Sequence, residues 1–337
     1  MRILGIETSF DDTGIAIYDD NIGLIINEVY SQSHIHSVYG GVVPELASRE
    51  HIYKLVPLIK YVLKKKKIFL NNINAVAYTA GPGLPGSLLV GASIGCALAF
   101  ACNIPAIPVH HMEGHLLSPM LEKHSPQFPF IALLVSGKHT QLILAHEMSK
   151  YELLGETLDD AVGEVFDKIA KALNLGYPGG AVLSTFAKKG ISGKFNFPHP
   201  MKYHSNFNFS FSGLKTFTLN LIRKNLHNIQ SLFDIARGFE DAVINILSHK
   251  CDQALKYTGF RQLVIAGGVS SNKNLILHLE RMLYKYRGKL FYARPEFCTD
   301  NAAMIAYTGM MYFKKYSFKK IDIIVRPKWK ITEIHPI

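Results

Sequence analysis

The chain has 337 residues, 48% hydrophobic and 19% charged, which is enough for about two domains of ~150 residues with substantial cores. This composition, with no low-complexity segment, fits an ordinary globular protein. The formal net charge of +11 comes from 37 Lys and Arg against 26 Asp and Glu and suits a polyanionic partner such as a nucleic acid. A composition rich in Ile, Lys and Asn can also follow from the genome, so charge alone leaves both explanations open.

The cysteines indicate a reduced, intracellular protein. Cys96, Cys102, Cys251 and Cys298 form no CxxC pair, so we expect buried thiols rather than a disulfide framework. The N-terminal "MRILGIETSF" lacks the long apolar core of a signal peptide. The apolar run 88–102 is short and rich in Gly and Ala, which favours a packed core helix over a membrane span. We expect a cytoplasmic protein that does not enter the membrane.

The first 130 residues alternate strand-like and helix-like segments. "RILGIETSFDDTGIAIYDD" predicts two strands joined by a turn, and "FIALLVSGKHTQLILA" predicts a second such hairpin about one domain length later. This repetition indicates two similar lobes, each with a turn whose backbone N–H groups suit a phosphate in a cleft between them. Four segments lie between the hairpins. A helix is predicted for "HIYKLVPLIKYVLKKKK", and a strand with a following turn for "NAVAYTAGPGLPG". A buried helix is predicted for "LLVGASIGCALAFACN", and a strand that leads to a pair of histidines for "IPAIPVHH".

The second half carries three more predicted units. "DDAVGEVFDKIAKALNLG" predicts a helix capped by Asp159 or Asp160 and ended by Gly176, and the tight turn "YPGG" follows it. "QLVIAGGVSSNKNLILHLERML" predicts a strand, a glycine loop that lets a ligand approach the backbone, and a helix. "CTDNAAMIAYTGMMYF" begins a final helix with Asp300 at its N-terminal end. The lysine runs at 64–67 and 314–320 are interpreted as solvated faces.

The stretch "HHMEGH" places His111 and His115 four residues apart, on one face of a helix. A bare HxxxH is more often a pair of surface or hydrogen-bonded histidines than a metal site. A zinc peptidase needs Glu directly after the first His, whereas here Glu113 comes one place late and is rotated about 100° around the helix. If a metal binds, Asp300 is the candidate third ligand, since a His/His/Asp set with open positions suits Zn²⁺ or Fe²⁺. Asp300 is equally suited to be a helix cap.

Four further signals are weak when each is taken alone. "AGGVSSN" fits an ordinary strand–helix turn, and "LVSGKHT" an ordinary hairpin turn. Asp167 fits a solvated helix face shared with Asp160 and Glu164, and Asp11 fits ordinary turn chemistry. Their order along the chain is more informative than any one of them.

Ten segments taken together resemble the tRNA N6-adenosine threonylcarbamoyltransferase family, formerly described as O-sialoglycoprotein endopeptidases. The segments are "ETSFDDTG", "YGGVVPELASREH", "GPGLPGSLLVG", "HHMEGH", "LVSGKHT", "GEVFDK", "YPGG", "FSFSGLKT", "AGGVSSN" and "TDNAAMIAY". The resemblance covers essentially the whole chain. It implies an α/β, two-lobed fold of the actin/Hsp70/sugar-kinase type with duplicated lobes around a nucleotide cleft. We expect an N-terminal lobe of residues 1–129 plus 296–337 and a C-terminal lobe of residues 130–295.

The resemblance also implies the reaction. The family transfers a threonylcarbamoyl group from threonylcarbamoyl-AMP to the N6 amine of the adenosine next to the anticodon, in tRNAs reading codons that begin with A, and releases AMP. His111, His115 and Asp300 match its metal ligands, with Fe²⁺ favoured and Zn²⁺ as the alternative. Asp11 matches a residue tied to activity. The implied partners are tRNA, a shorter non-catalytic paralogue and a small ATPase.

The residues implied to bind the acyl-adenylate lie in the second half. The turn residues expected at the phosphate are Leu134, Val135, Ser136, Gly137 and Lys138. Asp167, Gly180 and Asn272 are expected at the nucleoside part.

The sequence departs from the family pattern in both hairpin turns. The second turn reads SGKHT where the family has SGGHT, so Lys138 either crowds the ligand or adds a phosphate contact. In the first turn, Phe10 and Asp12 replace Cys and Glu. Two other functions stay open: a nucleotide-binding ATPase or scaffold of the same fold, disfavoured because it needs no HxxxH with Asp300, and a metallopeptidase, disfavoured by the misplaced Glu113.

Overall fold

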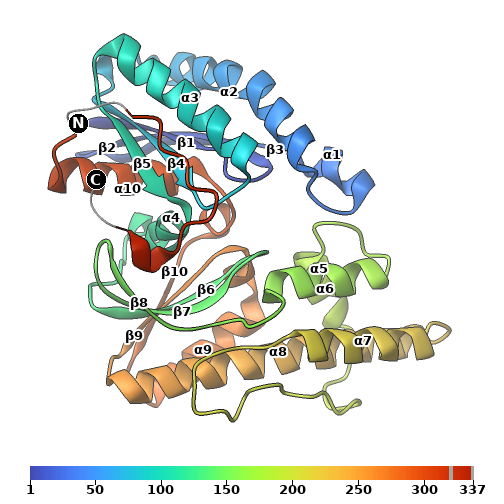
Figure 1. Cartoon of the computed structure of the whole chain (residues 1–337). Coiled ribbons are helices and arrows are strands. Elements are labelled where there is room, and N and C mark those ends of the chain that lie inside the picture. The colour runs from blue at the N-terminus through green and yellow to red at the C-terminus, as the bar shows by residue number, and fades with distance from the viewer. Residues whose placement is uncertain (319–321, 335–337) are drawn as a thin grey trace. The chain divides into compact units, whose positions relative to one another are not determined.

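The computed structural model describes residues 1–318 and 322–334 and divides into two compact units (Figure 1). The first unit comprises Met1–Ser125 and Ala293–Ile337, and the second comprises Pro126–Tyr292. The lobe boundaries expected from the sequence, at 129/130 and 295/296, lie close to these bounds, and the lobes themselves stay a prediction. Of the lysine run at 314–320, residues 319 and 320 lie outside the described residues.

The sheet of the first unit has five strands in the order β3–β2–β1–β4–β5. Their bounds are β1 (Arg2–Glu7), β2 (Asp12–Asp19), β3 (Gly23–Ser31), β4 (Ala75–Gly81) and β5 (Ala106–His110). β1 pairs antiparallel with β2, which is the predicted hairpin, and parallel with β4. β3 extends the hairpin antiparallel, and β5 extends the parallel side.

Helices cover both faces of this sheet (Figure 1). The helices of the first unit are α1 (Ser33–His36), α2 (Pro44–Lys66), α3 (Pro85–Cys102), α4 (His111–Leu117) and α10 (Ala302–Lys315). A side chain on Gly5 would collide with α10, whereas the neighbouring Ile6 packs near Gly95 of α3. Successive residues of a strand face opposite sides, so α10 and α3 lie on opposite faces of the sheet.

The second unit repeats this topology. Its sheet order is β8–β7–β6–β9–β10, with β6–β7 and β7–β8 antiparallel and β6–β9 and β9–β10 parallel. The strands are β6 (Phe130–Val135), β7 (Thr140–Glu147), β8 (Lys150–Glu156), β9 (Gln262–Ala266) and β10 (Lys289–Tyr292). The predicted duplication of one architecture is therefore confirmed at the level of strand order and strand direction.

Five helices of the second unit carry its apolar core. They are α5 (Val162–Ala172), α6 (Gly180–Ala187), α7 (Ser212–Lys224), α8 (Ile229–Thr258) and α9 (Lys273–Tyr284). The predicted cap of α5 is wrong, because the N-cap residue is Ala161 and makes no side-chain cap. Asp159 instead accepts hydrogen bonds from the backbone N–H groups of Phe211 and Ser212 and so caps the start of α7. Asp160 pairs with Lys215 and Lys168.

α3 is the one helix among the described residues that is long and apolar enough to cross a membrane by length and composition. It buries Leu88, Gly91, Ala92, Gly95 and Cys96 inside the first unit. This is weak evidence for a membrane span, because a core helix of a globular unit passes the same length and composition test. In the structure 39% of α3 is buried, and Leu89 and Phe100 are exposed.

Candidate functional site

The predicted histidines lie where β5 passes directly into α4. His110, the last residue of β5, is the N-cap of α4: its Nδ1 accepts from the N–H groups of Met112 and Glu113 at 3.2 and 3.4 Å. Its Nε2 donates to the carbonyl of Trp329 at 3.1 Å. His110 therefore has a structural role, and the cap sets the direction in which the first turn of α4 carries His111.

Gly114 explains how α4 comes so close to α10. A Cβ atom at Gly114 would lie 3.1 Å from Ile305 and 3.2 Å from Met304, both on α10. A larger residue there would force these two side chains to shift. The glycine inside "HMEGH" thus lets α4 lie close to α10, and Asp300 precedes α10 by two residues.

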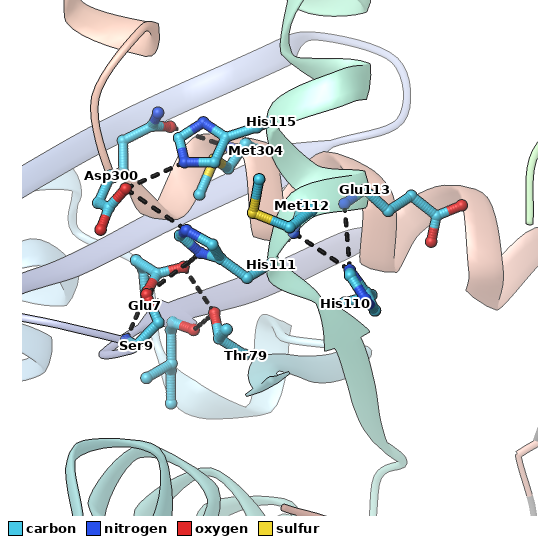
Figure 2. Close-up of polar contacts among 12 residues, drawn as sticks. Glu7, Ser9, Thr79, His110, His111, Met112, Glu113, His115, Asp300 and Met304 are labelled. Atoms are coloured by element: carbon cyan, nitrogen blue, oxygen red, sulfur yellow. Dashed lines mark hydrogen bonds and ion pairs between the residues drawn. The ribbon is translucent and has the colours of Figure 1, made fainter. Parts of the chain in front are cut away.

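His111, His115 and Asp300 converge on one point (Figure 2). Asp300 Oδ1 lies 3.0 Å from His115 Nε2 and 3.5 Å from His111 Nε2, and the three ligand atoms all lie within 4.8 Å of one another. Ligands held about 2.0–2.2 Å from one cation are separated by about 3.0–3.5 Å, so this donor set fits a divalent metal. Both histidines are buried while the Asp300 side chain is 22% exposed, which leaves one side of the site accessible.

Asn301 resolves the ambiguity over Asp300. The N-cap of α10 is Asn301, whose Oδ1 accepts from the N–H of Met304 at 3.1 Å and whose Nδ2 donates to the carbonyls of Phe297 and Thr299. The interpretation of Asp300 as the helix cap is therefore wrong. Since its neighbour caps the helix, the Asp300 carboxylate is available to the histidines.

Glu7 supports His111 from behind and is a residue that the sequence analysis missed (Figure 2). It is fully buried at the end of β1, and its Oε2 lies 3.2 Å from His111 Nδ1. Its oxygens also accept from the Ser9 N–H at 2.6 Å and the Thr79 hydroxyl at 2.7 Å. A carboxylate that binds one ring nitrogen directs the other towards a metal. His115 Nδ1, by contrast, is buried without a partner in the described part of the chain.

Glu113 lies on another side of α4. Figure 2 shows its side chain directed away from His111, His115 and Asp300. It is fully buried, and its carboxylate accepts a hydrogen bond from Tyr312. A peptidase base must reach a water molecule at the metal, so this position argues against peptide hydrolysis.

The first turn, between β1 and β2, is anchored on both sides. His51 Nε2 binds the Phe10 carbonyl at 2.8 Å, and the Leu84 N–H donates to the Ser9 carbonyl at 2.8 Å. Phe10 places its ring edge-to-face against His111 at a centroid distance of 5.4 Å. Asp11 is half-buried in this turn.

Asp12, the next residue, was noted in the sequence only as a departure from the family. Burial raises the pKa of its carboxyl to about 7, and repulsion from Asp300, Asp11 and Glu7 adds to the effect, while a hydrogen bond from Ser31 opposes it. A carboxyl group with this pKa exchanges protons near neutral pH.

The predicted phosphate turn, Leu134–Lys138, spans the end of β6 and the start of the connection to β7 in the second unit. Leu134 and Val135 are buried strand residues, and Gly137 and Lys138 are exposed. Ser136 Oγ accepts hydrogen bonds from the N–H groups of Lys138 and His139 at 3.3 and 3.1 Å. Two backbone N–H groups of the turn are therefore already hydrogen-bonded to this hydroxyl.

Two glycines let other segments approach this turn closely. A Cβ atom at Gly163 would lie 2.4 Å from the Ser136 carbonyl oxygen, and one at Gly267 would lie 2.4 Å from that of Val135. The start of α5 and the predicted glycine loop therefore lie against the turn. Figure 1 shows β6 and β7 in the same sheet as β9, which ends at that loop.

Asp167 and Asn272 both make structural hydrogen bonds. Asp167 accepts from the Gly179 N–H at 2.8 Å and closes the "YPGG" turn, so the interpretation as a solvated face is wrong. Burial raises its pKa, against hydrogen bonds from Gly179 and Gly180. Asn272 caps α9 through Oδ1, and its Nδ2 donates to Ser184 and to the buried Glu240. Asn272 therefore has only one lone pair of Oδ1 left to offer a ligand.

A family model described as tRNA N6-adenosine threonylcarbamoyltransferase matches residues 23–307, most of the chain. The matched range contains all predicted site residues except Asp11.

Three solved structures share the fold. HypF of T. kodakarensis superposes with a TM-score of 0.60 at 16% identity, over 93% of this chain and 48% of HypF, so the chain spans about half the length of that protein. Component A of the Acidaminococcus fermentans (R)-2-hydroxyglutaryl-CoA dehydratase gives 0.55 at 13% identity, over 94% and 98% of the two chains. The activator of the Clostridium difficile 2-hydroxyisocaproyl-CoA dehydratase, with bound ADPNP, gives 0.54 at 12% identity, over 95% and 100%. With the duplicated sheets, these matches confirm the predicted actin/Hsp70/sugar-kinase-like fold.

Proposed function

The chain belongs to the tRNA N6-adenosine threonylcarbamoyltransferase family, and from this we propose that it transfers a threonylcarbamoyl group from threonylcarbamoyl-AMP to the N6 amine of the adenosine next to the anticodon. The substrates would be tRNAs reading codons that begin with A, and AMP would be released. The observation that carries the proposal is the convergence of His111, His115 and Asp300 in a chain matched to this family over residues 23–307.

The proposed metal ligands are His111, His115 and Asp300. A divalent cation bound there, Fe²⁺ by family resemblance or Zn²⁺, would supply Lewis-acid polarisation of the carbonyl oxygen of the transferred group. Glu7 would hold the His111 ring so that Nε2 faces the cation, since it already binds Nδ1. Phe10, packed against His111, and the two buried histidines would limit the access of water from one side of the site.

The transfer itself needs a proton acceptor. The N6 nitrogen forms a bond to the carbamoyl carbon, the bond from that carbon to the AMP phosphate oxygen breaks, and N6 loses one proton. We propose Asp11 for this proton, as the family resemblance implies, and Asp12 as its neighbour with a pKa of about 7. Brønsted behaviour favours a base whose pKa lies near the working pH, which supports testing Asp12 beside Asp11.

The proposed acyl-adenylate site lies in the second unit. Leu134, Val135, Ser136, Gly137 and Lys138 would hold the phosphate region. The remaining amide of the turn, that of Gly137, and the exposed Lys138 side chain suit an anion. Asp167, Gly180 and Asn272 would contact the nucleoside part. Support comes from the close approach of Gly163 and Gly267 to the turn, which places these segments together.

We further propose that the chain works in the cytoplasm with a shorter non-catalytic paralogue and a small ATPase, as the family resemblance implies. A pull-down of the tagged chain from native lysate followed by mass spectrometry tests this. Recovery of neither partner at stoichiometric levels would contradict it.

The reaction is tested with synthetic threonylcarbamoyl-AMP, unmodified tRNA and the helper proteins, followed by digestion of the RNA and quantification of the modified nucleoside. His111→Ala and Asp11→Ala are expected to lose activity by about two orders of magnitude or more, since one removes a metal ligand and the other a positioned carboxylate. Asp12→Asn tests the second carboxylate in the same assay. Glu113→Gln is expected to matter little, because Gln still accepts from Tyr312.

A peptidase would give the reverse pattern, with Glu113 essential and tRNA irrelevant. Wild-type protein that forms no modified nucleoside with all helpers present, yet cleaves a glycoprotein in a Glu113-dependent way, would overturn the proposed function.

A further inference from the structure

Three adjoining cavities run along α8 and α9 in the second unit. Their volumes are about 370, 370 and 540 Å³. The first and second share Asn245, His278 and Arg281, and the second and third share Lys285. We call this continuous feature the α8/α9 groove. It contains none of the residues assigned above to the metal or to the acyl-adenylate.

The charges in the α8/α9 groove are mostly positive and mostly unpaired. Its two carboxylates are already neutralised, Asp241 by Arg237 at 3.0 Å and Asp252 by Lys256 at 2.7 Å. The other cations that line it make no ion pair within residues 1–318 and 322–334. These unpaired cations are Lys202, Arg261, Arg281, Lys285 and Arg287.

Three of the unpaired cations, Lys202, Arg281 and Lys285, line the second cavity together with His278. His278 lies among Arg281, Lys202 and Lys285: burial lowers its pKa, and the positive charges of these three residues lower it further, against Asp241. The pKa of His249 is likewise lowered by burial and then by Lys202 and Lys250. Ser248 fixes the His278 ring through a hydrogen bond of 2.9 Å to Nδ1. Two imidazoles with lowered pKa values among unpaired cations give hydrogen-bonding groups inside a positive field.

Exposed aromatic rings flank these charges. Tyr203 is 79% exposed, its ring lies 5.5 Å from that of His249, and Lys202 Nζ lies 5.3 Å from its centroid. Tyr284, between Arg281 and Lys285 in sequence, is 86% exposed. Cations neutralise phosphates, and exposed rings stack on bases. A free phosphate ion would use the cations alone, so the combination favours a polynucleotide.

We propose that the α8/α9 groove binds the phosphate backbone of an RNA, with Lys202, Arg281 and Lys285 as phosphate contacts and Tyr203 as a stacking surface. Arg281 and Lys285 lie four residues apart, which places them side by side on the surface of α9 and its C-terminal end. The identity of that RNA as a tRNA rests on the proposed function. The groove would supply affinity for the RNA and would take no part in the transfer step.

The test measures the dissociation constant of the full-length chain for unmodified tRNA across a salt series. The groove variant is Lys202→Ala/Arg281→Ala/Lys285→Ala. The matched control is Lys60→Ala/Lys64→Ala/Lys66→Ala, which removes the same charge from exposed lysines of α2 that make no ion pair within the described residues. Circular dichroism and melting curves check that both variants are folded.

We expect the groove variant to bind tRNA at least about tenfold more weakly near 0.1 M salt, and the slope of log affinity against log salt to fall by about two to three. The control is expected to stay within about twofold of wild type. Tyr203→Ala should weaken binding about fivefold or more without changing the salt slope, and Tyr203→Phe should restore it, because stacking needs the ring and not the hydroxyl.

The proposal is overturned if the groove variant keeps the wild-type affinity and slope, or if both triple variants lose affinity equally. Inorganic phosphate and AMP are titrated in parallel; loss of their binding in the groove variant with unchanged tRNA affinity would make the groove a small-anion site and also overturn it. The transfer assay separates the two proposals. If the groove variant forms the modified nucleoside normally and binds tRNA as tightly as wild type, only the proposal for the groove is refuted. If the groove variant binds tRNA more weakly but wild type forms no modified nucleoside, only the proposed transfer reaction is refuted.

Discussion

Glu7 is the residue whose position most constrains the candidate metal site. Both of its carboxylate oxygens are occupied, Oε1 by the Ser9 N–H and Oε2 by the Thr79 hydroxyl and His111 Nδ1. An ionised carboxylate only accepts, so the contact with Glu7 favours the His111 tautomer protonated on Nδ1. That tautomer presents the lone pair of Nε2 to the point where His115 and Asp300 converge. Glu7 therefore acts on the metal through His111 and is a positioning residue.

Glu7→Gln is expected to raise the dissociation constant of the divalent metal by about 10- to 100-fold, because the amide keeps only one oxygen for three donors. Calorimetry or competition with a chromophoric chelator measures the affinity in protein loaded with Zn²⁺, or with Fe²⁺ under anaerobic conditions. The nitrogen chemical shifts of the His111 ring should show a smaller population of the tautomer protonated on Nδ1. A general structural defect would not change the population of this one tautomer.

Glu113→Gln is the matched control, since Glu113 is equally buried on α4 but directed away from the metal ligands. Its metal affinity should equal that of wild type. A Glu7→Gln variant that binds metal as tightly as wild type would refute the positioning role.

At the scale of elements, Gly5 sets how closely α10 lies on the sheet of the first unit. A Cβ atom there would lie 2.6 Å from the Ala302 carbonyl oxygen and 2.7 Å from the Ala306 nitrogen, which are backbone atoms that cannot rotate away. α10 would have to move outward as a body. Asp300 precedes α10 by two residues, so its carboxylate would move away from His111 and His115.

Gly5→Ala is expected to lower the free energy of unfolding by about 1–3 kcal/mol through overpacking, and to weaken metal binding as a second consequence. Urea denaturation measures the first effect and metal titration the second. Gly41→Ala is the control, since no atom lies within 4 Å of a Cβ built there, and its stability should change by less than about 1 kcal/mol. Equal stability of the two variants would contradict this account of the α10 contact.

The elements that could be predicted from the sequence are those with a local signal. An apolar run on each side of a short polar turn predicted both hairpins. The histidines were correctly placed where a strand, β5, leads into a helix, α4. α2 begins at Pro44, seven residues before the predicted start, because proline at a first helical turn was not used as a start signal. The outer strands β3, β8 and β10 were not predicted, since each is defined by the strand it pairs with.

The parts of the site that could not be predicted depend on residues distant in sequence. Glu7 meets His111 across 104 positions, and no local pattern indicates such a pair. Asp159 was expected to cap α5 but caps α7, whose start lies more than fifty residues further on. Whether Asp300 capped its helix or faced the histidines was left open by the sequence, and the capping role of Asn301 decides it.

At the scale of the whole molecule, the first unit is built from two distant parts of the chain. Residues 1–125 supply the sheet and α4, and the segment from residue 293 onward supplies Asp300 and α10. His115 and Asp300, whose side chains lie 3.0 Å apart, are separated by 185 positions. A cation bound by His111, His115 and Asp300 would therefore join the C-terminal segment to the rest of its unit, and its binding free energy would add to the stability of the folded chain.

Removal of the metal is expected to lower the melting temperature of the wild-type chain by about 5 °C or more. A ligand at 100 times its dissociation constant stabilises the folded state by about 2.7 kcal/mol, and 1 kcal/mol shifts the melting temperature of a unit of this size by about 2–4 °C. Scanning calorimetry of metal-loaded and chelator-treated protein measures the shift, and hydrogen exchange of α10 should rise more than that of α8, which lies in the other unit. His115→Ala and Asp300→Asn, purified without metal, should melt at the same temperature with and without added cation. Two results would mean that these three residues do not form the binding site. One is a wild-type melting temperature that does not change at saturating metal, and the other is a shift in the variants equal to that of wild type.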